Sequence, residues 1–426
     1  MMSQAKQLES KSFSDVSETL EPQNKQPYSY FFERGKELLA KGLIAESLDV
    51  YKEAIEYHHD YPFSYFVLGN AYEKGGDRLQ GLESYRKALE INSINHNLRL
   101  KQPSKKSRYS ILNERQFYSL SNTIVNLSIA CNQTQDLSAS LAQISNHIND
   151  VAFCLTTTRK LLKLEKYDEA IAFLTKAQEL SKFDADFSQQ QELEYLWVSV
   201  NQAKQNQVLL QDRDYKIISL GYDCLPRTVA TLWGLKPRKS AGELTCPFDL
   251  ALHPYESIVE ALNTDFYNYL NPDFLISFQV VKAYDENEKF TCVKNTRYNC
   301  LFSHERAEQF RINNFAKLIA LYRRRIHNFY RYINSSPVLF LIHSRKNINL
   351  DPLIQILLHK FPNLKFKVML LVSGTKAISP KINDGLAMTY NIPCPSNYRW
   401  PTTSARRITY EKTISEAIKE TIINNF

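Results

Sequence analysis

The chain has 426 residues, of which 43% are hydrophobic and 12% aromatic, and its formal net charge is +8 at pH 7. This length is too great for one hydrophobic core and predicts two or three domains, while the apolar content excludes a chain that is disordered throughout. The mild positive charge does not indicate nucleic-acid binding, so we expect no nucleic-acid partner.

The cysteines and the missing motifs exclude several kinds of site. Seven cysteines without regular spacing do not form a disulfide framework, and no C-x-x-C pair indicates zinc. Neither a G-x-G-x-x-G nor a Walker loop is present. We therefore expect no metal and no cofactor. No apolar signal-peptide core and no run of about 18 apolar residues is found, so we expect a cytoplasmic protein without a membrane partner.

The first 205 residues contain a polar tail and an internal repeat. Residues 1–27 are rich in Ser, Gln, Glu and Lys and are predicted to be disordered. Two copies of a 34-residue repeat follow, at 28–61 and 62–95, and each is predicted to form two helices. Small and aromatic residues recur at matching positions: Phe31 with Tyr65, Gly35 with Gly69, Tyr51 with Tyr85, and Ala54 with Ala88.

The length and signature positions of these copies resemble the tetratricopeptide repeat. A degenerate third copy is predicted at about 151–184, because Ala170 and Ala177 fit the second helix whereas Cys154 and Thr158 replace the usual aromatic residue and glycine of the first.

Two repeats bury too little apolar surface to be stable alone. Residues 28–205 are therefore predicted to form one α-solenoid, with the basic stretch 99–110 as an insertion or loop. The resemblance implies a concave groove that binds a protein or peptide partner. The alternative is that the repeats only support the neighbouring domain.

The pattern changes from residue 214 onward. Short apolar runs at 216–220, 338–342 and 366–372 are each followed by small or polar residues and a helical stretch. This alternation predicts an α/β domain at 214–426 with a mostly parallel sheet. A long helical insertion is predicted between the first two strands.

Ligands bind beyond the carboxyl ends of the strands in such sheets. If the three strands are neighbours, a thiol, an imidazole, a guanidinium and a hydroxyl lie on one edge. These groups belong to the segments Gly221 to Cys224, His343 to Arg345, and Ser373-Gly374.

Cys224 is the strongest nucleophile candidate in the chain. It follows a short strand and a bend at Gly221, and a helix is predicted to begin directly after it. A thiol in the first turn of a helix has a lowered pKa, and the backbone N–H groups of that turn are suited to holding an oxyanion. The alternative is a buried cysteine that only fills space.

Three ordered motifs and a basic helix resemble a bacterial family of domains labelled putative papain-like cysteine peptidase, over roughly residues 214–426. The motifs are Ser219-Leu-Gly-Tyr-Asp-Cys224, Pro247-Phe-Asp249 and Phe302-Ser-His304, with the Arg-rich helix around 322–331. The resemblance implies that Cys224 is the catalytic nucleophile, His304 the general base and Asp249 a supporting residue. Leu250 departs from the family, which favours Trp there.

Each of these roles has an alternative. His343 is a rival base, and Asp249 is equally well explained as the N-cap of a helix beginning at Leu250. The strand–helix units resemble a doubly wound sheet more than a papain half-barrel, and the block around Cys224 also resembles the opening of SGNH-type esterases, where serine is expected. Papain-like enzymes usually place the residue that orients the imidazole after the histidine, so Asn347, Asn349 and Asp351 are alternatives to Asp249. The arginines at 323–325 with Arg331 form either an ordinary surface helix or an anion site.

These observations predict a cysteine-dependent hydrolase or acyltransferase of the peptidase-like type, whose repeats recruit a protein. The alternative function is a non-enzymatic scaffold or adaptor, in which the repeats bind one partner and the α/β domain binds a ligand or another protein.

Overall fold

The structure is a computed structural model that describes residues 27–131, 133, 137–282, 285–373, 378–383, 385–395 and 405–426. The predicted disordered tail, apart from residue 27, and the edge residue Gly374 lie outside these ranges. The chain forms two compact units, Met1–Thr157 with Thr175–Asp184, and Thr158–Leu174 with Ala185–Phe426.

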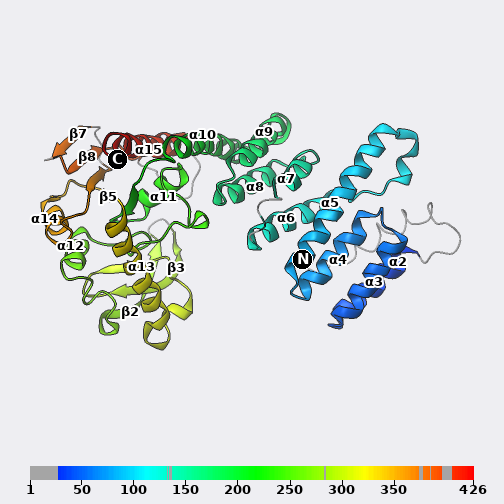
Figure 1. The fold of residues 1–426 in the computed structure, drawn as a ribbon, viewed down its shortest axis with the longest axis horizontal. Coiled ribbons are helices and arrows are strands. Elements are labelled where there is room, and N and C mark those ends of the chain that lie inside the picture. The colour runs from blue at the N-terminus through cyan, green and yellow to red at the C-terminus, as the bar shows by residue number, and fades with distance from the viewer. Residues whose placement is uncertain are drawn as a thin grey trace. The chain divides into compact units, whose positions relative to one another are not determined.

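The first unit is helical. The helices α2 and α3 pack as one hairpin and α4 and α5 as the next (Figure 1), as the two repeat copies predict. A short 3-10 helix η1 and an irregular segment occupy most of the predicted insertion at 99–110. The bounds are α2 Tyr28–Ala40, α3 Ile44–Tyr57, α4 Pro62–Lys74, α5 Arg78–Lys101, η1 Pro103–Arg108, α6 Glu114–Ala130 and α7 Leu137–Ser145. The next two helices, α8 Val151–Lys163 and α9 Tyr167–Asp184, each contribute residues to both units.

Glycine allows the helices of each clear repeat to approach closely. A Cβ atom on Gly35 would lie 2.4 Å from the ring of Tyr51, and one on Gly69 would lie 2.7 Å from the ring of Tyr85. Both tyrosines are buried, with exposed fractions of 2% and 0%. The prediction that small residues mark close helix contacts is therefore confirmed.

The degenerate copy consists of α8 and α9. Cys154 and Thr158 are fully buried in α8, and Ala170 and Ala177 are fully buried in α9. The replaced signature residues therefore still lie in the interior. Among the described residues, no helix is long and apolar enough to cross a membrane.

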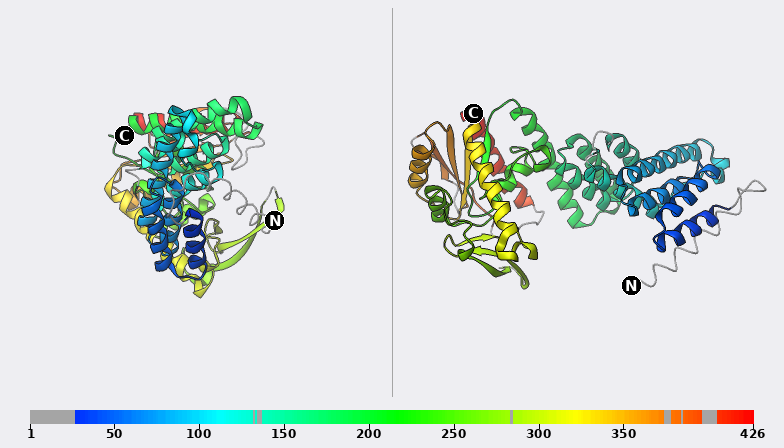
Figure 2. Two further views of the ribbon diagram at one scale, coloured as in Figure 1. Left: turned by 90° about the vertical axis from the view of Figure 1, so that its right-hand side faces the viewer. Right: turned by 60° about the horizontal axis from the view of Figure 1, so that its bottom comes forward.

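The second unit is an α/β domain. Its helix α10 lies beside α15 (Figure 1 and Figure 2). The bounds are α10 Phe187–Leu210, β1 Lys216–Ser219, α11 Leu225–Leu232, η2 Lys239–Ala241, α12 Tyr255–Asn263, η3 Pro272–Phe274, β2 Leu275–Lys282, β3 Asp285–Asn295, β4 Cys300–Phe302, η4 Glu308–Phe310, η5 Asn313–Phe315, α13 Ala316–Ser335, β5 Val338–Ser344, α14 Asp351–Lys360, β6 Phe366–Val372, β7 Ile378–Asn383, β8 Ala387–Asn391 and α15 Ala405–Asn425.

A five-stranded sheet with the order β1-β5-β6-β8-β7 forms the centre of this domain. The strands β1, β5, β6 and β8 are parallel, and β7 pairs antiparallel with β8. Helices α12, α13 and α14 cover one face and α11 and α15 the other, so alternate strand residues such as Ile217 and Ile218 enter opposite cores. The predicted parallel sheet is confirmed, and its first three strands are neighbours.

The segment between β1 and β5 differs from the predicted helical insertion, because it also contains the antiparallel sheet β2-β3-β4. The β2–β3 hairpin extends away from the five-stranded sheet (Figure 2). Most of β2 is exposed or half-buried, including Ile276 and Val281, so these residues do not form the continuous apolar run of a buried strand.

Candidate active site

The carboxyl ends of three neighbouring strands bring together a carboxylate, an imidazole and a hydroxyl. His343 near the end of β5 has its Nδ1 2.9 Å from Asp223 Oδ2, and Asp223 follows β1. The Nε2 of the same ring is 2.5 Å from Oγ of Ser373, which follows β6. The predicted polar edge is therefore present, although Arg345 has an exposed side chain.

Asp223, His343 and Ser373 form a row of hydrogen-bonded side chains, and further contacts hold both of its ends. Asp223 Oδ1 accepts a hydrogen bond from the Leu225 N–H at 3.0 Å, where α11 begins. At the other end, the hydroxyls of Ser373 and Tyr410 are 2.6 Å apart. The His343 side chain is only 7% exposed, whereas that of Asp223 is 30% exposed. The row thus leads from the interior to a carboxylate in contact with solvent.

Cys224 lies beside this row as the N-cap residue of α11, with a half-buried side chain. The bend before it needs glycine, because a Cβ atom on Gly221 would lie 2.2 Å from the Asp223 carbonyl oxygen. Burial raises the pKa of the Cys224 thiol, the Asp223 carboxylate raises it further, and the positive charge of Arg227 only partly opposes the rise. The predicted lowering of the Cys224 pKa is therefore wrong, since burial and a neighbouring carboxylate outweigh the helix terminus.

His304 is exposed in the turn after β4, between the buried residues Ser303 and Glu305. Partial burial of the ring lowers the pKa of its imidazole, and the positive charges of Arg306, Arg325 and Arg227 lower it further. The ring is therefore neutral and able to accept a proton at pH 7. Within the described part of the chain, no hydrogen bond joins the Cys224 thiol to His304 or to His343.

Arg227 connects the three residues that the family resemblance implies. Its Nε is 3.5 Å from Oδ2 of Asp249, which is fully buried. Its charge also acts on the Cys224 thiol and on the His304 imidazole. Arg227, to which the sequence assigned no role, therefore contacts one of these residues and acts on the other two through its charge.

Asp249 stabilises a turn rather than a helix. Its Oδ2 accepts a hydrogen bond from the Cys246 N–H at 2.8 Å, within a turn that includes residues 247–250. The next helix, α12, begins at Tyr255. The alternative of a helix N-cap before Leu250 is therefore wrong. Among the described contacts, Asp249 meets Arg227 and not the imidazole of His304.

The basic helix α13 contains two kinds of arginine. Arg323, Arg324 and Arg331 are exposed, as expected of a surface helix. Arg325 is buried instead, and its Nη2 is 2.8 Å from Oε1 of Glu305. A single buried arginine within a basic run has no distinct sequence signal. In the part of the chain that is described, no group of three His, Cys, Asp or Glu residues is arranged to hold a metal ion.

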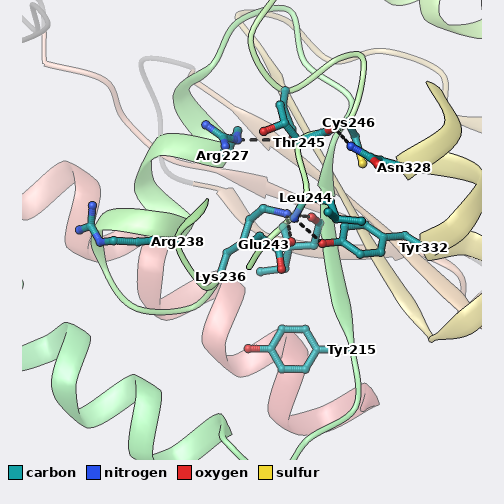
Figure 3. A network of polar contacts seen from close by, with 12 residues as sticks. Tyr215, Arg227, Lys236, Arg238, Glu243, Leu244, Thr245, Cys246, Asn328 and Tyr332 are labelled. Atoms are coloured by element: carbon teal, nitrogen blue, oxygen red, sulfur yellow. Dashed lines mark hydrogen bonds and ion pairs between the residues drawn. The ribbon is translucent and has the colours of Figure 1, made fainter. Parts of the chain in front are cut away.

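A separate polar network lies at the amino end of β1. Lys236 and Glu243 form a buried ion pair of 2.7 Å beside the ring of Tyr332 (Figure 3). Lys236 Nζ also donates a hydrogen bond to the Ile217 carbonyl at 2.5 Å. An adjoining cavity of about 210 Å³ is lined by Lys216, Lys236 and Glu243, among others. The charges of this ion pair satisfy each other, so the network ties the loop after α11 to β1.

Comparisons with known proteins agree with the two resemblances. Residues 215–375 match the family described as "Putative papain-like cysteine peptidase (DUF1796)". Residues 64–95 and 161–184 match the tetratricopeptide repeat. A search of curated proteins finds no match. Tetratricopeptide repeats imply protein partners in general. The chain thus has tetratricopeptide repeats in its N-terminal region and, at residues 215–375, a domain of the family carrying the papain-like peptidase label.

Proposed function

We propose that the C-terminal domain is a cysteine-dependent hydrolase or acyltransferase in which Cys224 attacks an acyl carbon. The observation that carries this proposal is the contact of Arg227, on the helix that Cys224 caps, with Asp249 of the second motif. The guanidinium lies 3.5 Å from Asp249 and its charge acts on both the Cys224 thiol and the His304 imidazole. A nucleophile, a proton acceptor and a fixed positive charge are the groups that acyl transfer needs.

The raised pKa of Cys224 and the lowered pKa of His304 favour general-base catalysis over a resting thiolate–imidazolium ion pair. A raised pKa keeps the Cys224 thiol protonated at pH 7, and a lowered pKa keeps the His304 imidazole neutral. As Sγ bonds to the acyl carbon, its proton passes to the imidazole, directly or through water, and then to the leaving group. Water hydrolyses the thioester, or a second nucleophile accepts the acyl group. Asp249 holds Arg227 and so acts as a positioning residue.

The repeats supply the second part of the proposal. Tetratricopeptide repeats bind proteins or peptides, so we assign to them the recruitment of a substrate or partner protein in the cytoplasm. The rival function is a non-enzymatic scaffold. It is favoured by one observation, the raised pKa of Cys224, which makes the free thiol less reactive than an ordinary surface cysteine.

Acetylation by p-nitrophenyl acetate tests the proposal on the full chain. We expect an acetyl group on Cys224 that neutral hydroxylamine removes, as it does from a thioester. His304→Gln slows this acetylation by roughly 10²–10⁴-fold, the usual contribution of a general base. Cys394→Ala, which removes another half-buried thiol, leaves the rate unchanged. Acetylation of Cys224 at the same rate with and without His304 would favour the scaffold.

A further inference from the structure

We propose that Ser373, His343 and Asp223 form a second hydrolytic site, a serine triad that acts on carboxylic esters and does not depend on Cys224. The three residues come from the ends of β6, β5 and β1, which are consecutive in the sheet. Neither family similarity assigns a role to Ser373. The proposal rests on the contacts between these side chains.

The hydrogen bonds have the order of a catalytic triad. A carboxylate can only accept, so in the tautomer with a proton on Nδ1 the His343 ring donates to Asp223 Oδ2 at 2.9 Å. Nε2 is then unprotonated and accepts the Ser373 hydroxyl proton at 2.5 Å. Serine, histidine and carboxylate in this order define the triad by geometry, whatever their order along the chain.

The surrounding contacts hold each member in place. The Leu225 N–H binds the second oxygen of Asp223 at 3.0 Å, so the carboxylate keeps its orientation toward the ring. Tyr410 on α15 is 2.6 Å from Ser373 Oγ and is positioned to donate to it. Burial raises the pKa of the Tyr410 phenol, so it remains protonated and able to donate. When the Tyr410 phenol donates to Ser373 Oγ, the Ser373 proton is directed to His343.

The reaction follows from this arrangement. Ser373 Oγ bonds to the ester carbonyl carbon while its proton moves to His343 Nε2, and Asp223 remains ionised beside the resulting imidazolium. The carbon–oxygen bond to the alcohol breaks, and Nε2 returns the proton to the departing alkoxide. Water then cleaves the acyl-serine by the same proton transfers. An ester suits this site because an alkoxide is a better leaving group than an amide nitrogen, and the one proton that His343 has received releases it as the alcohol.

Labelling with a fluorophosphonate, which phosphonylates activated serines, tests the triad in the full-length wild-type chain. We expect one adduct, located on Ser373 by peptide mapping. Ser373→Ala abolishes labelling, and His343→Gln slows it by at least about 100-fold, as loss of a general base does. Ser29→Ala, which removes an exposed hydroxyl from helix α2 of the other unit, labels at the wild-type rate, because it leaves the triad intact.

The outcome is separable from that of the proposed cysteine chemistry. The wild-type measurement needs no variant to fold, so a folded chain without an adduct on Ser373 would overturn the triad. The p-nitrophenyl acetate experiment reports on Cys224 through a hydroxylamine-labile thioester, whereas an acetyl-serine resists neutral hydroxylamine. Each nucleophile is thus supported or rejected by its own adduct.

Discussion

At the scale of single residues, Asp223 affects both proposed nucleophiles. Its carboxylate orients His343, at 2.9 Å, and its charge raises the pKa of the neighbouring Cys224 thiol. Asp223→Asn separates these effects. The amide can donate to Nδ1 and place the proton on Nε2, so we expect fluorophosphonate labelling of Ser373 to fall by up to about 10⁴-fold. Loss of the negative charge lowers the Cys224 pKa, so iodoacetamide alkylation of that thiol at pH 7 becomes faster.

Both rates are measured by mass spectrometry on the same sample, which makes each the control for the other. A variant that had simply lost structure would expose Cys224 and would also lose its cooperative thermal transition. Equal slowing of both reactions would contradict the assignment of two roles to Asp223.

His304 provides a prediction on pH. Because its pKa is lowered, the basic imidazole persists below the ordinary histidine value of about 6.5. The acetylation rate of Cys224 is therefore expected to fall only below that pH. Arg306→Gln removes one of the positive charges that lower the pKa, so the acid limb moves to higher pH. NMR titration of the His304 ring provides the direct measurement, and a pKa that drops in Arg306→Gln would contradict the electrostatic explanation.

The sequence identified part of the site and missed its contacts. The motifs containing Cys224, Asp249 and His304 could be recognised, and strand-end positions placed His343 and Ser373 on one edge. The hydrogen bonds among Asp223, His343 and Ser373 depend on strand order and register, which one sequence does not contain. The direction of the Cys224 pKa was missed because it depends on burial in the folded domain.

At the scale of helices and strands, the repeat hairpins depend on glycine at the helix contact. Gly35→Ala places a Cβ atom 2.4 Å from the Tyr51 ring. We expect the overpacking to cost about 1–3 kcal/mol, partly offset by the better helix propensity of alanine, about 1 kcal/mol. Urea unfolding followed by circular dichroism measures the difference.

Ser29→Ala is the matched control, because it introduces alanine at an exposed position of the same helix α2. The control should leave the free energy of unfolding nearly unchanged. If Gly35→Ala proved as stable as the control, Tyr51 would have to move freely, and the close helix contact would not be a constraint.

The sequence predicted those elements whose pattern is local. Phe366–Val372 is a continuous apolar run, and the strand β6 has the same bounds. The strand β3, Asp285–Asn295, begins with acidic and amide residues and has no such run. Its pairing partner β2 is largely exposed, so cross-strand pairing rather than an intrinsic preference defines this sheet.

At the scale of the whole molecule, each of the two units has its own buried interior. Tyr51 and Tyr85 lie in the first, and the two cores on either side of the five-stranded sheet lie in the second. Separate interiors are consistent with the two activities that we propose, recognition of a protein by the repeats and acyl transfer by the α/β domain. They also predict that the units unfold as distinct cooperative steps.

Differential scanning calorimetry of the full chain tests this independence with one substitution in each unit. Gly69→Ala forces a Cβ atom to within 2.7 Å of Tyr85 and should lower one transition temperature, at a cost of about 1–3 kcal/mol. Glu243→Gln removes the negative charge that lies 2.7 Å from the buried Lys236 ammonium and should lower only the other, by a larger amount, about 3–5 kcal/mol. If a single transition moved with both substitutions, the two units would fold as one cooperative body. A defect in the repeats would then also reduce labelling of Cys224 and Ser373.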